Sequence, residues 1–400
     1  MTVVVVDKLV PGGQGLCRDD KGVFFVDGVA AGDRIEVEVD GKRRGVREGR
    51  LLTVLEPSAD RAAADCALSS LCGGCDWLHL SRDAQTRWKH ATVIDALRRI
   101  GRFADDDVTR FLRPLLVPPS AESAARRRAR FVVDAGGRLS LSARRSHERV
   151  AIPACPALDA RLSATVSLMP RLTPGSVVAL AVDDEGVVAG LEKEVDVDVV
   201  ASKVRGVLTA GGKLIGDPVL RGEVTAGFLP ARSDALTFSQ ATRFGGAAIR
   251  EQVMRGVGEV DGLRVLELFA GAGHLSLPLA KAGAVVDAVE GDARGLAHLV
   301  ANARAFDLAI AARRAFIDEQ LPFGDVDVVV ADPPRTGIPG AAELFARLRA
   351  QRLVLVSCDL ATGARDLAAA AKAGFVVDDV TPIDAFPRTH HVEWVAVLSR

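Results

Sequence analysis

A chain of 400 residues with 48% hydrophobic content is long enough to bury a large core and to form two or three domains, while its net charge of −1 gives no overall attraction to nucleic acid. Asp7 and Lys8 interrupt the first apolar run and no later run reaches membrane-spanning length, so we expect a cytoplasmic protein without membrane helices. Six cysteines are too few for a disulfide scaffold of this size, and clustered ones are therefore candidate ligands.

Residues 1–57 alternate short β-prone runs with glycine turns. The runs are Val3–Val6, Val23–Val26 and Asp33–Val39, and the sequence Gly-Gly-Gln-Gly at 12–15 separates the first two. This pattern predicts a small β-barrel, and five-stranded barrels of this kind often hold single-stranded nucleic acid. Basic residues at its end would contact phosphates, with a solvated basic turn as an equal alternative; they are Lys42, Arg43, Arg44, Arg47 and Arg50.

The middle region, residues 58–235, has a mixed α+β pattern. A helix is predicted over Asp83–Ile100 and a strand over Arg130–Val133. Arginines gather at 126–130 and at 144–145, and as a group they favour contact with RNA, although each one alone is as well explained as a solvated surface charge.

A cysteine group lies at the start of this region. Cys66, Cys72 and Cys75 fall within ten residues around two glycines, and Cys155 between two prolines offers a fourth thiol. Four thiolates suit zinc or an iron–sulfur cluster, and the spacing is not that of a zinc ribbon. We therefore favour a [4Fe-4S] cluster with a structural role over zinc or over unrelated buried thiols.

Residues 236–400 alternate strands with helices. Strands are predicted at Arg264–Phe269, Ala284–Glu290, Val326–Ala331, Gln351–Ser357 and Val392–Leu398, with helices after Gly273, from Asp292 and over Ala361–Lys372. This is the pattern of a doubly wound, Rossmann-like α/β domain, in which ligands bind beyond the carboxyl ends of the strands.

The first strand of this domain ends in a glycine turn. Gly271 and Gly273 follow Phe269 and allow a ligand to approach the backbone, and Glu290 ends the next strand, where a carboxylate can hold ribose hydroxyls. Dehydrogenases share these features. A nicotinamide site does not require Asp332-Pro333-Pro334-Arg335 at the third strand end, so this sequence favours an S-adenosylmethionine site.

Cys358 and Glu393 are the candidate reactive residues. Cys358 follows a buried strand and precedes a helix, whose amide groups are expected to favour the thiolate over the alternative of a buried structural thiol. Glu393 begins the final strand and is the candidate general base. His390 and His391 are alternatives, of which His391 has the strand parity to share a pocket with Glu393.

Taken together, the motifs resemble the RNA (uracil-5-)-methyltransferase family, in its branch with an N-terminal TRAM barrel and a [4Fe-4S] cluster. The resemblance covers nearly the whole chain. It rests on the cysteines with Asp76–Leu80, on Phe238-Ser239-Gln240, and on the glycine turn, Glu290, Asp332–Arg335, Ser357-Cys358-Asp359 and His391-Val392-Glu393.

The resemblance implies a class I methyltransferase domain at 236–400, a middle domain at 58–235 with the cluster on Cys66, Cys72, Cys75 and Cys155, and a TRAM-like barrel at 1–57. It implies that Cys358 attacks carbon 6 of a uracil so that carbon 5 can accept a methyl group from S-adenosylmethionine, and that Glu393 then removes the proton from carbon 5. The cofactor would contact Gln240, Phe269, Gly271, Gly273, His274, Glu290, Asp318 and Asp332, and the substrate would contact Phe238, Gln240 and Asp332.

The implied partner is RNA, with 23S ribosomal RNA favoured over tRNA, and we expect a monomer. The alternatives are a cytosine-5 methyltransferase, which is not expected to carry the Gln240 and Glu393 motifs, and a non-catalytic RNA-binding or ribosome-assembly factor. Three departures from the family pattern are expected to weaken local contacts: Ala241-Thr242 for Val-Asn, His274 for asparagine, and Asp359-Leu360 for Asn-Pro.

Overall fold

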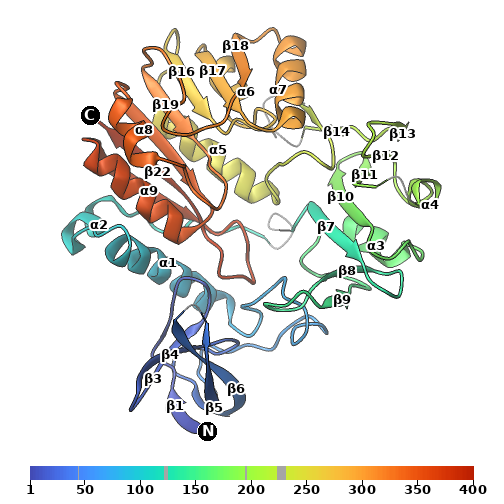
Figure 1. Cartoon of the computed structure of the whole chain (residues 1–400), viewed down its shortest axis with the longest axis vertical. Coiled ribbons are helices and arrows are strands. Elements are labelled where there is room, and N and C mark those ends of the chain that lie inside the picture. The colour runs from blue at the N-terminus through green and yellow to red at the C-terminus, as the bar shows by residue number, and fades with distance from the viewer. Residues whose placement is uncertain (44, 121–124, 194–195, 223–230) are drawn as a thin grey trace.

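The computed structural model describes the chain except for residues 44, 121–124, 194–195 and 223–230. Three large sheets follow one another along the chain: an N-terminal sheet, a middle sheet and a C-terminal sheet (Figure 1). Among the described residues, none of the helices combines the length and the apolar character needed to cross a membrane.

The N-terminal sheet has six strands in the order β1-β5-β6-β4-β3-β2 around a small core that includes Phe24 and Ile35. The three predicted runs overlap β1, β4 and β5, whereas β2, β3 and β6 were not predicted individually. Arg44 of the predicted basic group lies outside the described residues. The strands are β1 (Thr2–Val5), β2 (Lys8–Leu9), β3 (Gly15–Asp19), β4 (Gly22–Val26), β5 (Arg34–Arg43) and β6 (Val46–Glu56).

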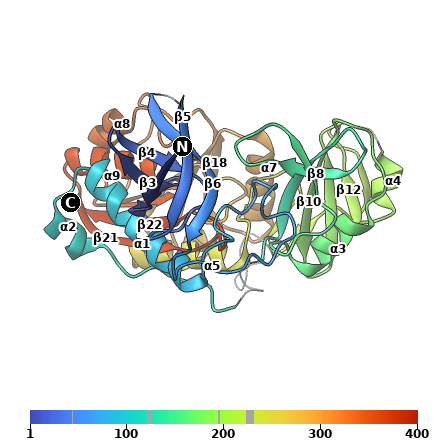
Figure 2. The ribbon, with the colours of Figure 1, turned by 90° about the horizontal axis from the view of Figure 1, so that it is seen from below.

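The middle sheet has seven strands in the order β13-β12-β11-β10-β7-β8-β9, with α3 and α4 packed against it. Seen from below, it extends away from the other two sheets (Figure 2). Its elements are β7 (Arg128–Val133), β8 (Leu139–Ser142), β9 (Arg149–Ala151), α3 (Ala160–Leu168), β10 (Val177–Asp183), β11 (Gly186–Leu191), α4 (Val197–Ala201), β12 (Gly206–Leu208) and β13 (Leu214–Gly216). A two-stranded ribbon follows, β14 (Leu220–Arg221) with β15 (Arg232–Ser233).

The C-terminal sheet has the order β18-β17-β16-β19-β20-β22-β21, and β22 runs antiparallel between β20 and β21. The predicted α/β class is confirmed, because helices cover both faces of this mostly parallel sheet. Its elements are α5 (Arg243–Val257), β16 (Arg264–Leu268), α6 (Ser276–Lys281), β17 (Val285–Glu290), α7 (Ala293–Ala305), β18 (Ile310–Arg314), β19 (Val328–Ala331), α8 (Ala341–Arg347), β20 (Arg352–Ser357), α9 (Leu360–Lys372), β21 (Val376–Ile383) and β22 (Glu393–Ser399).

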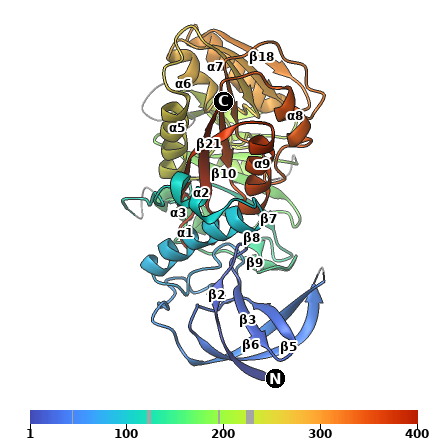
Figure 3. The same cartoon turned by 90° about the vertical axis from the view of Figure 1, so that its left-hand side faces the viewer.

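Two helices between the N-terminal and middle sheets, α1 (Arg82–Arg99) and α2 (Asp105–Phe111), pack in space against the C-terminal sheet. Val93, Leu97 and Phe111 share a core with α9 and β21, and α1 lies between the N-terminal and C-terminal sheets (Figures 1 and 3). The Ser81 side chain caps α1 by accepting a hydrogen bond from the amide of Ala84. The helix therefore forms a bridge from the barrel to the sheet that carries the candidate site.

Candidate active site

The turn after β16 holds its backbone in the left-handed region. Phe269, Gly271 and Gly273 have φ angles of 64°, 55° and 95°. A Cβ on Gly273 would lie 2.7 Å from the Leu299 side chain, so glycine is required for α7 to pack closely on this turn. Phe269 adopts the same region with a bulky side chain, a strained geometry that is concentrated at ligand sites.

Glu290 closes this turn from the end of β17. Its carboxylate accepts hydrogen bonds from the backbone amides of Gly271 at 2.7 Å and Asp292 at 2.6 Å. The glycine turn and the acid predicted to hold a ribose are therefore joined directly, and the remaining lone pairs of the carboxylate can accept hydroxyl protons.

Most of the residues predicted to contact cofactor and substrate line one pocket at the carboxyl edge of the sheet. The lining includes Phe238, Gln240, Phe269, Gly271, His274 and Asp332. Gln240 Nε2 donates to Asp332 Oδ2 at 3.5 Å, and the Phe238 side chain is 74% exposed at the rim. Gly273, Glu290 and Asp318 are not among the lining residues: Gly273 packs against Leu277 and Leu299, and Asp318 lies in the segment after β18, where it accepts from the amide of Gln320.

Glu267 is a pocket residue that sequence reasoning missed. It lines the same pocket from β16 and is buried, and the Ser276 hydroxyl donates to its carboxyl group. Burial raises the pKa of Glu267 to about 8, and the neighbouring acids add to the effect. An acid within an otherwise apolar buried strand was the signal available in the sequence.

Cys358 and Glu393 meet at the same edge of the sheet. The pairing of β20 with β22 sets Ser357 opposite Trp394, so the register brings residue 358 opposite residue 393. Asp332 follows β19, the strand on the other side of β20, and its charge acts on both Cys358 and Glu393. The three predicted side chains are therefore gathered at adjacent strand ends.

The expected lowering of the Cys358 pKa is wrong in this structure. Burial raises the pKa of the thiol to about 12, the carboxyl groups of Glu393 and Asp332 raise it further, and Arg335 opposes them. Burial likewise raises the pKa of Asp332 to about 7 and that of Glu393 to about 8. A cationic ligand in this pocket would lower all three pKa values.

The two alternative bases are engaged elsewhere. His390 Nδ1 pairs with Asp76, and the His391 ring stacks on His390 with its centroid 4.1 Å away. Burial and the charges of His390 and Arg335 lower the pKa of His391 to about 3, which makes it a weak base. Glu393 is thus the better-placed proton acceptor.

Three residues that depart from the family pattern, Asp359, Thr242 and His274, form helix caps or backbone contacts in the structure. The Asp359 side chain accepts from the amides of Ala361 and Thr362 and so caps α9 directly after Cys358. Thr242 caps α5, and its hydroxyl donates to the carbonyl of Ala385. His274 Nε2 lies 3.1 Å from the carbonyl oxygen of Gly246. Asp359 and Thr242 therefore fix the backbone at the two positions where looser contacts were expected.

The four predicted metal cysteines line one cavity of about 170 Å³, together with Arg126, Arg128, Arg130 and Arg388. The Gly74 amide points to Cys72 Sγ at 3.4 Å, and burial raises the pKa of Cys75 to about 11. Within the described ranges, no three His, Cys, Asp or Glu side chains are grouped closely enough for a single metal ion. Four thiols around a cavity with arginines in its wall fit an anionic cluster.

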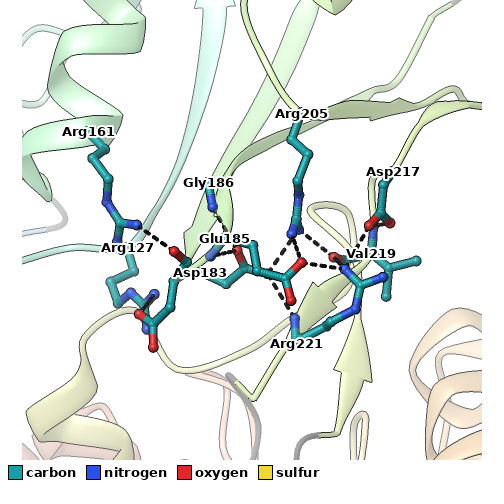
Figure 4. Close-up of polar contacts among 10 residues, drawn as sticks. Arg127, Arg161, Asp183, Glu185, Gly186, Arg205, Asp217, Val219 and Arg221 are labelled. Atoms are coloured by element: carbon teal, nitrogen blue, oxygen red, sulfur yellow. Dashed lines mark hydrogen bonds and ion pairs between the residues drawn. The ribbon is translucent and has the colours of Figure 1, made fainter.

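Several arginines predicted to grip RNA are used inside the protein. Arg128 Nη2 donates to the carbonyls of Asp234 and Thr237, both at 2.7 Å, and so supports the turn that presents Phe238. Arg127 is buried and points to Asp184 in the turn between β10 and β11. Figure 4 shows this turn, where Arg205 and Arg221 also bind acids.

In the barrel, Asp19 binds Arg47 through both carboxylate oxygens, and Glu38 binds Arg50. Arg47, Arg127 and Arg128 therefore each have intramolecular partners that help to set the position of the side chain, and contact of the arginine group with RNA stays a prediction.

Comparison with known proteins gives full-length matches. The chain is 30% identical to a 23S rRNA (uracil(1939)-C(5))-methyltransferase of Halomonas elongata, over 99% of this chain and 89% of the relative. It is 30% identical to the enzyme of the same description from Pseudomonas entomophila, over 99% and 93%. An uncharacterized RNA methyltransferase of Gloeobacter violaceus is 28% identical over 99% and 96%. No family model matches the chain.

Among solved structures, the chain is similar to the tRNA (uracil-54, C5)-methyltransferase of Pyrococcus abyssi in complex with S-adenosyl-L-homocysteine. The TM-score is 0.76 with 20% identity, over 99% of this chain and all of the other. The likeness therefore extends over all three sheets and establishes the fold.

Proposed function

Because the chain belongs to the RNA (uracil-C5) methyltransferase family, whose members use S-adenosylmethionine to methylate a uridine, we propose that Cys358 and Glu393 carry out this reaction on a uridine of 23S ribosomal RNA. The observation that carries the assignment of these two residues is the strand register that brings residue 358 opposite residue 393, beside Asp332 and Gln240.

Cys358 begins the reaction. Its thiol loses a proton to solvent, and Sγ forms a bond to carbon 6 of the uracil while the electron pair of the C5–C6 double bond moves toward the carbonyl at carbon 4. Carbon 5 becomes nucleophilic as a result. S-adenosylmethionine, when bound, supplies the electrophilic methyl group for carbon 5.

Glu393 completes the exchange. Its carboxylate removes the proton from carbon 5, the double bond forms again, and the Cys358 thiolate leaves. Asp332 and Gln240 lie beside this position and are suited to orient the uracil ring, while Phe238 offers a face for stacking at the pocket rim.

The cofactor contacts are proposed for Phe269, Gly271, Gly273, His274, Glu290 and Asp318, with Gln240 and Asp332 shared between cofactor and substrate. Glu290 would accept the ribose hydroxyls, and Glu267 adds a buried acid that can accept from the cofactor's ammonium group. The raised pKa values of Glu267, Asp332 and Glu393 support this assignment, because a site that accumulates acids suits a cationic ligand.

Cys66, Cys72, Cys75 and Cys155 are proposed to hold a [4Fe-4S] cluster. It would supply a cross-link between the loop at 66–75 and the segment at 155, and the arginines in the cavity wall would balance its charge. We further propose that residues 1–57 act as an RNA-binding barrel, that 58–235 and 236–400 serve as cluster and methyltransferase domains, and that the protein works as a cytoplasmic monomer.

The test is covalent capture of RNA. Incubation with S-adenosylmethionine and an RNA fragment that carries 5-fluorouridine should give a protein–RNA adduct that resists denaturation, because fluorine at carbon 5 cannot be removed as a proton. Cys358→Ala should give none, and normal adduct formation by that variant would refute the assignment. Parallel reactions with 23S ribosomal RNA and with tRNA decide between the two RNA classes.

A further inference from the structure

Three segments that are distant in sequence contact one another close to the loop that leads into Glu393, the candidate base. They are the Gly12–Gly15 turn of the N-terminal sheet, the pair Asp76-Trp77 directly after Cys75, and the loop at 384–392 between β21 and β22, which we term the base loop because it leads into Glu393. Each segment contacts the other two, so this junction is continuous from the barrel to the catalytic edge of the C-terminal sheet.

Asp76 binds the base loop through both carboxylate oxygens. Oδ1 accepts a hydrogen bond from the His390 amide at 3.1 Å, and Oδ2 pairs with Nδ1 of the His390 ring. One side chain therefore fixes both the backbone and the imidazole of a residue that lies three positions before Glu393.

Neighbouring contacts hold the rest of the base loop in one conformation. The Trp77 amide donates to the Arg388 carbonyl at 2.9 Å, and the Arg388 amide donates to Gln85 Oε1 at 2.8 Å. Arg388 itself has a φ of 72°, a region that arginine enters only when its surroundings compensate the strain. The loop conformation is thus imposed from outside the C-terminal sheet.

The barrel completes the junction through Gly13. The Trp77 indole donates to the Gly13 carbonyl at 2.9 Å. Gly13 has a φ of 85°, and a Cβ at this position would lie 2.7 Å from Asp76 Oδ2 and 2.9 Å from His390 Cβ. The absence of a side chain at Gly13 therefore allows the predicted glycine turn to lie close to Asp76 and His390.

From His390 the contacts continue to the active site. The His390 ring contacts the His391 ring in a tilted arrangement, and His391 Nε2 lies 3.4 Å from Arg335 Nη2. Glu393 then pairs with Ile383 in the sheet, and the register of β20 with β22 brings it opposite Cys358. Cys358 lies between β20 and α9, neither of which forms a hydrogen bond to Asp76 or His390 in the described part of the chain. A shift of this loop would therefore move Glu393 more than Cys358.

We propose that Asp76 is a positioning residue for the proton-removal step: through His390 it aims Glu393 at carbon 5, so that docking of the barrel and of the cysteine loop governs release of the methylated RNA. The inference rests on the proposed function. Because attack by Cys358 precedes proton removal, loss of Asp76 should slow release and leave attack nearly intact. A misplacement of a catalytic group by about 1 Å costs about 10²-fold in rate.

The experiment compares Asp76→Ala with wild type on two RNAs. With 5-fluorouridine RNA, which stops before proton removal, the variant should form the adduct within a few-fold of the wild-type rate. With ordinary RNA, it should accumulate a methylated covalent adduct that wild type does not accumulate, and its kcat should fall about 10- to 100-fold at an unchanged KM for S-adenosylmethionine. Asp76→Asn keeps the Oδ1 acceptor for the His390 amide and should recover part of the rate.

Asp60→Asn is the matched control, because the Asp60 side chain binds Arg87 and the Trp88 indole of α1 and has no hydrogen bond to the described residues of the base loop. It should leave both reactions unchanged. If Asp76→Ala fails to fold, His390→Phe keeps a ring for stacking, removes the hydrogen bond from Nδ1, and should give the same accumulation.

Equal losses in attack and release, or no loss at all, would overturn the role of Asp76. Absence of an adduct from the wild-type protein would instead overturn the proposed function, so the two failures are distinguishable.

Discussion

Glu267 and Asp332 line one pocket, the charge of Asp332 acts on Glu393, and burial raises the pKa of all three carboxyl groups toward or above neutrality. Such groups favour a ligand that brings positive charge. S-adenosylmethionine carries ammonium and sulfonium charges, and loss of the methyl group removes the sulfonium charge. The same acids that attract the cofactor therefore hold the spent product less strongly.

Glu393→Gln should slow release of the methylated RNA without preventing attack of Cys358 on the uracil. The amide keeps the size of the side chain but cannot take a proton, so we expect release of methylated RNA to slow by about 10²- to 10⁴-fold while attack by Cys358 continues. Denaturing gels of reactions with ordinary RNA should show an accumulating covalent complex with a labelled methyl group. Rapid turnover without this complex would show that another group removes the proton.

The release step should depend on pH through Glu393. Burial raises its pKa to about 8, so the carboxyl group is mostly protonated at pH 6 and cannot accept a proton. Decay of the methylated adduct should therefore accelerate about tenfold per pH unit as pH rises toward about 8 and then level off. A rate constant that stays flat from pH 6 to pH 9 would contradict the assignment.

Stability of the ligand-free protein should also depend on pH through Glu267. Its folded pKa, about 8, exceeds the ordinary value of 4.5, so the native state binds more protons than the unfolded state between these values. Stability contributed by the protonated group is present below pH 4.5 and is lost as pH rises to about 8. Thermal melts of Glu267→Gln, which cannot ionise, should show a smaller decrease over this interval than melts of wild type.

At the scale of elements, α1 is locked to the C-terminal sheet by one buried ion pair. Lys89 Nζ lies 2.5 Å from Asp384 Oδ1, both side chains are fully buried, and Nζ also donates to the Phe386 carbonyl at 2.8 Å. Lys89→Met would leave the buried Asp384 carboxylate with the partly exposed Arg82, 2.9 Å away, as its remaining cation, so we expect a loss near the lower end of about 3–5 kcal/mol of unfolding free energy. Urea denaturation measures this loss. Lys8→Met, which breaks the partly exposed pair with Asp95, should cost about 1 kcal/mol or less.

Elements with strong periodicity were predictable and edge elements were not. The predicted α1, β16, β17 and α9 agree with the structure to within about two residues. The edge strands β18 and β21 were missed, because Ile-Ala-Ala-Arg-Arg has little strand preference and β21 contains two acids and a proline. The helices α5 and α8 were missed too, and glycines in α5 that admit Ala385 and Gln240 weaken its helical pattern.

The candidate site was predictable in its reacting residues but not in its supports. Ligands of an α/β sheet bind beyond the carboxyl ends of its strands, so the positions of Cys358, Glu393 and Asp332 next to strand ends predicted that they belong to the site. The pairing of Asp76 with His390 joins residues that lie 314 positions apart, and no local pattern encodes such a contact. The contacts of Arg128 could not be predicted for the same reason, since its carbonyl partners, Asp234 and Thr237, are 106 and 109 positions away.

At the scale of the whole molecule, ion pairs join the N-terminal sheet to the middle sheet. Arg145 lies 3.1 Å from Asp27 and 3.2 Å from Glu48, and Arg144 donates to the Cys75 carbonyl at 3.5 Å. The cysteine loop thus lies where the barrel, the middle sheet and the base loop converge, and a cross-link there would stabilise all three contacts together.

Cys155→Ser tests this arrangement as a whole. Loss of one of four thiolate ligands should remove most of the iron and the absorbance at about 400 nm. It should also lower the melting temperature and make the loop at 66–75 sensitive to proteases, because that loop would lose its link to the middle sheet. Cys17→Ala is the matched control, since Cys17 is buried in the barrel core, and it should keep both iron and absorbance. If Cys155→Ser retains its full iron content, Cys155 is not a ligand. If the wild-type protein contains zinc and no iron, the site binds zinc and not an iron–sulfur cluster.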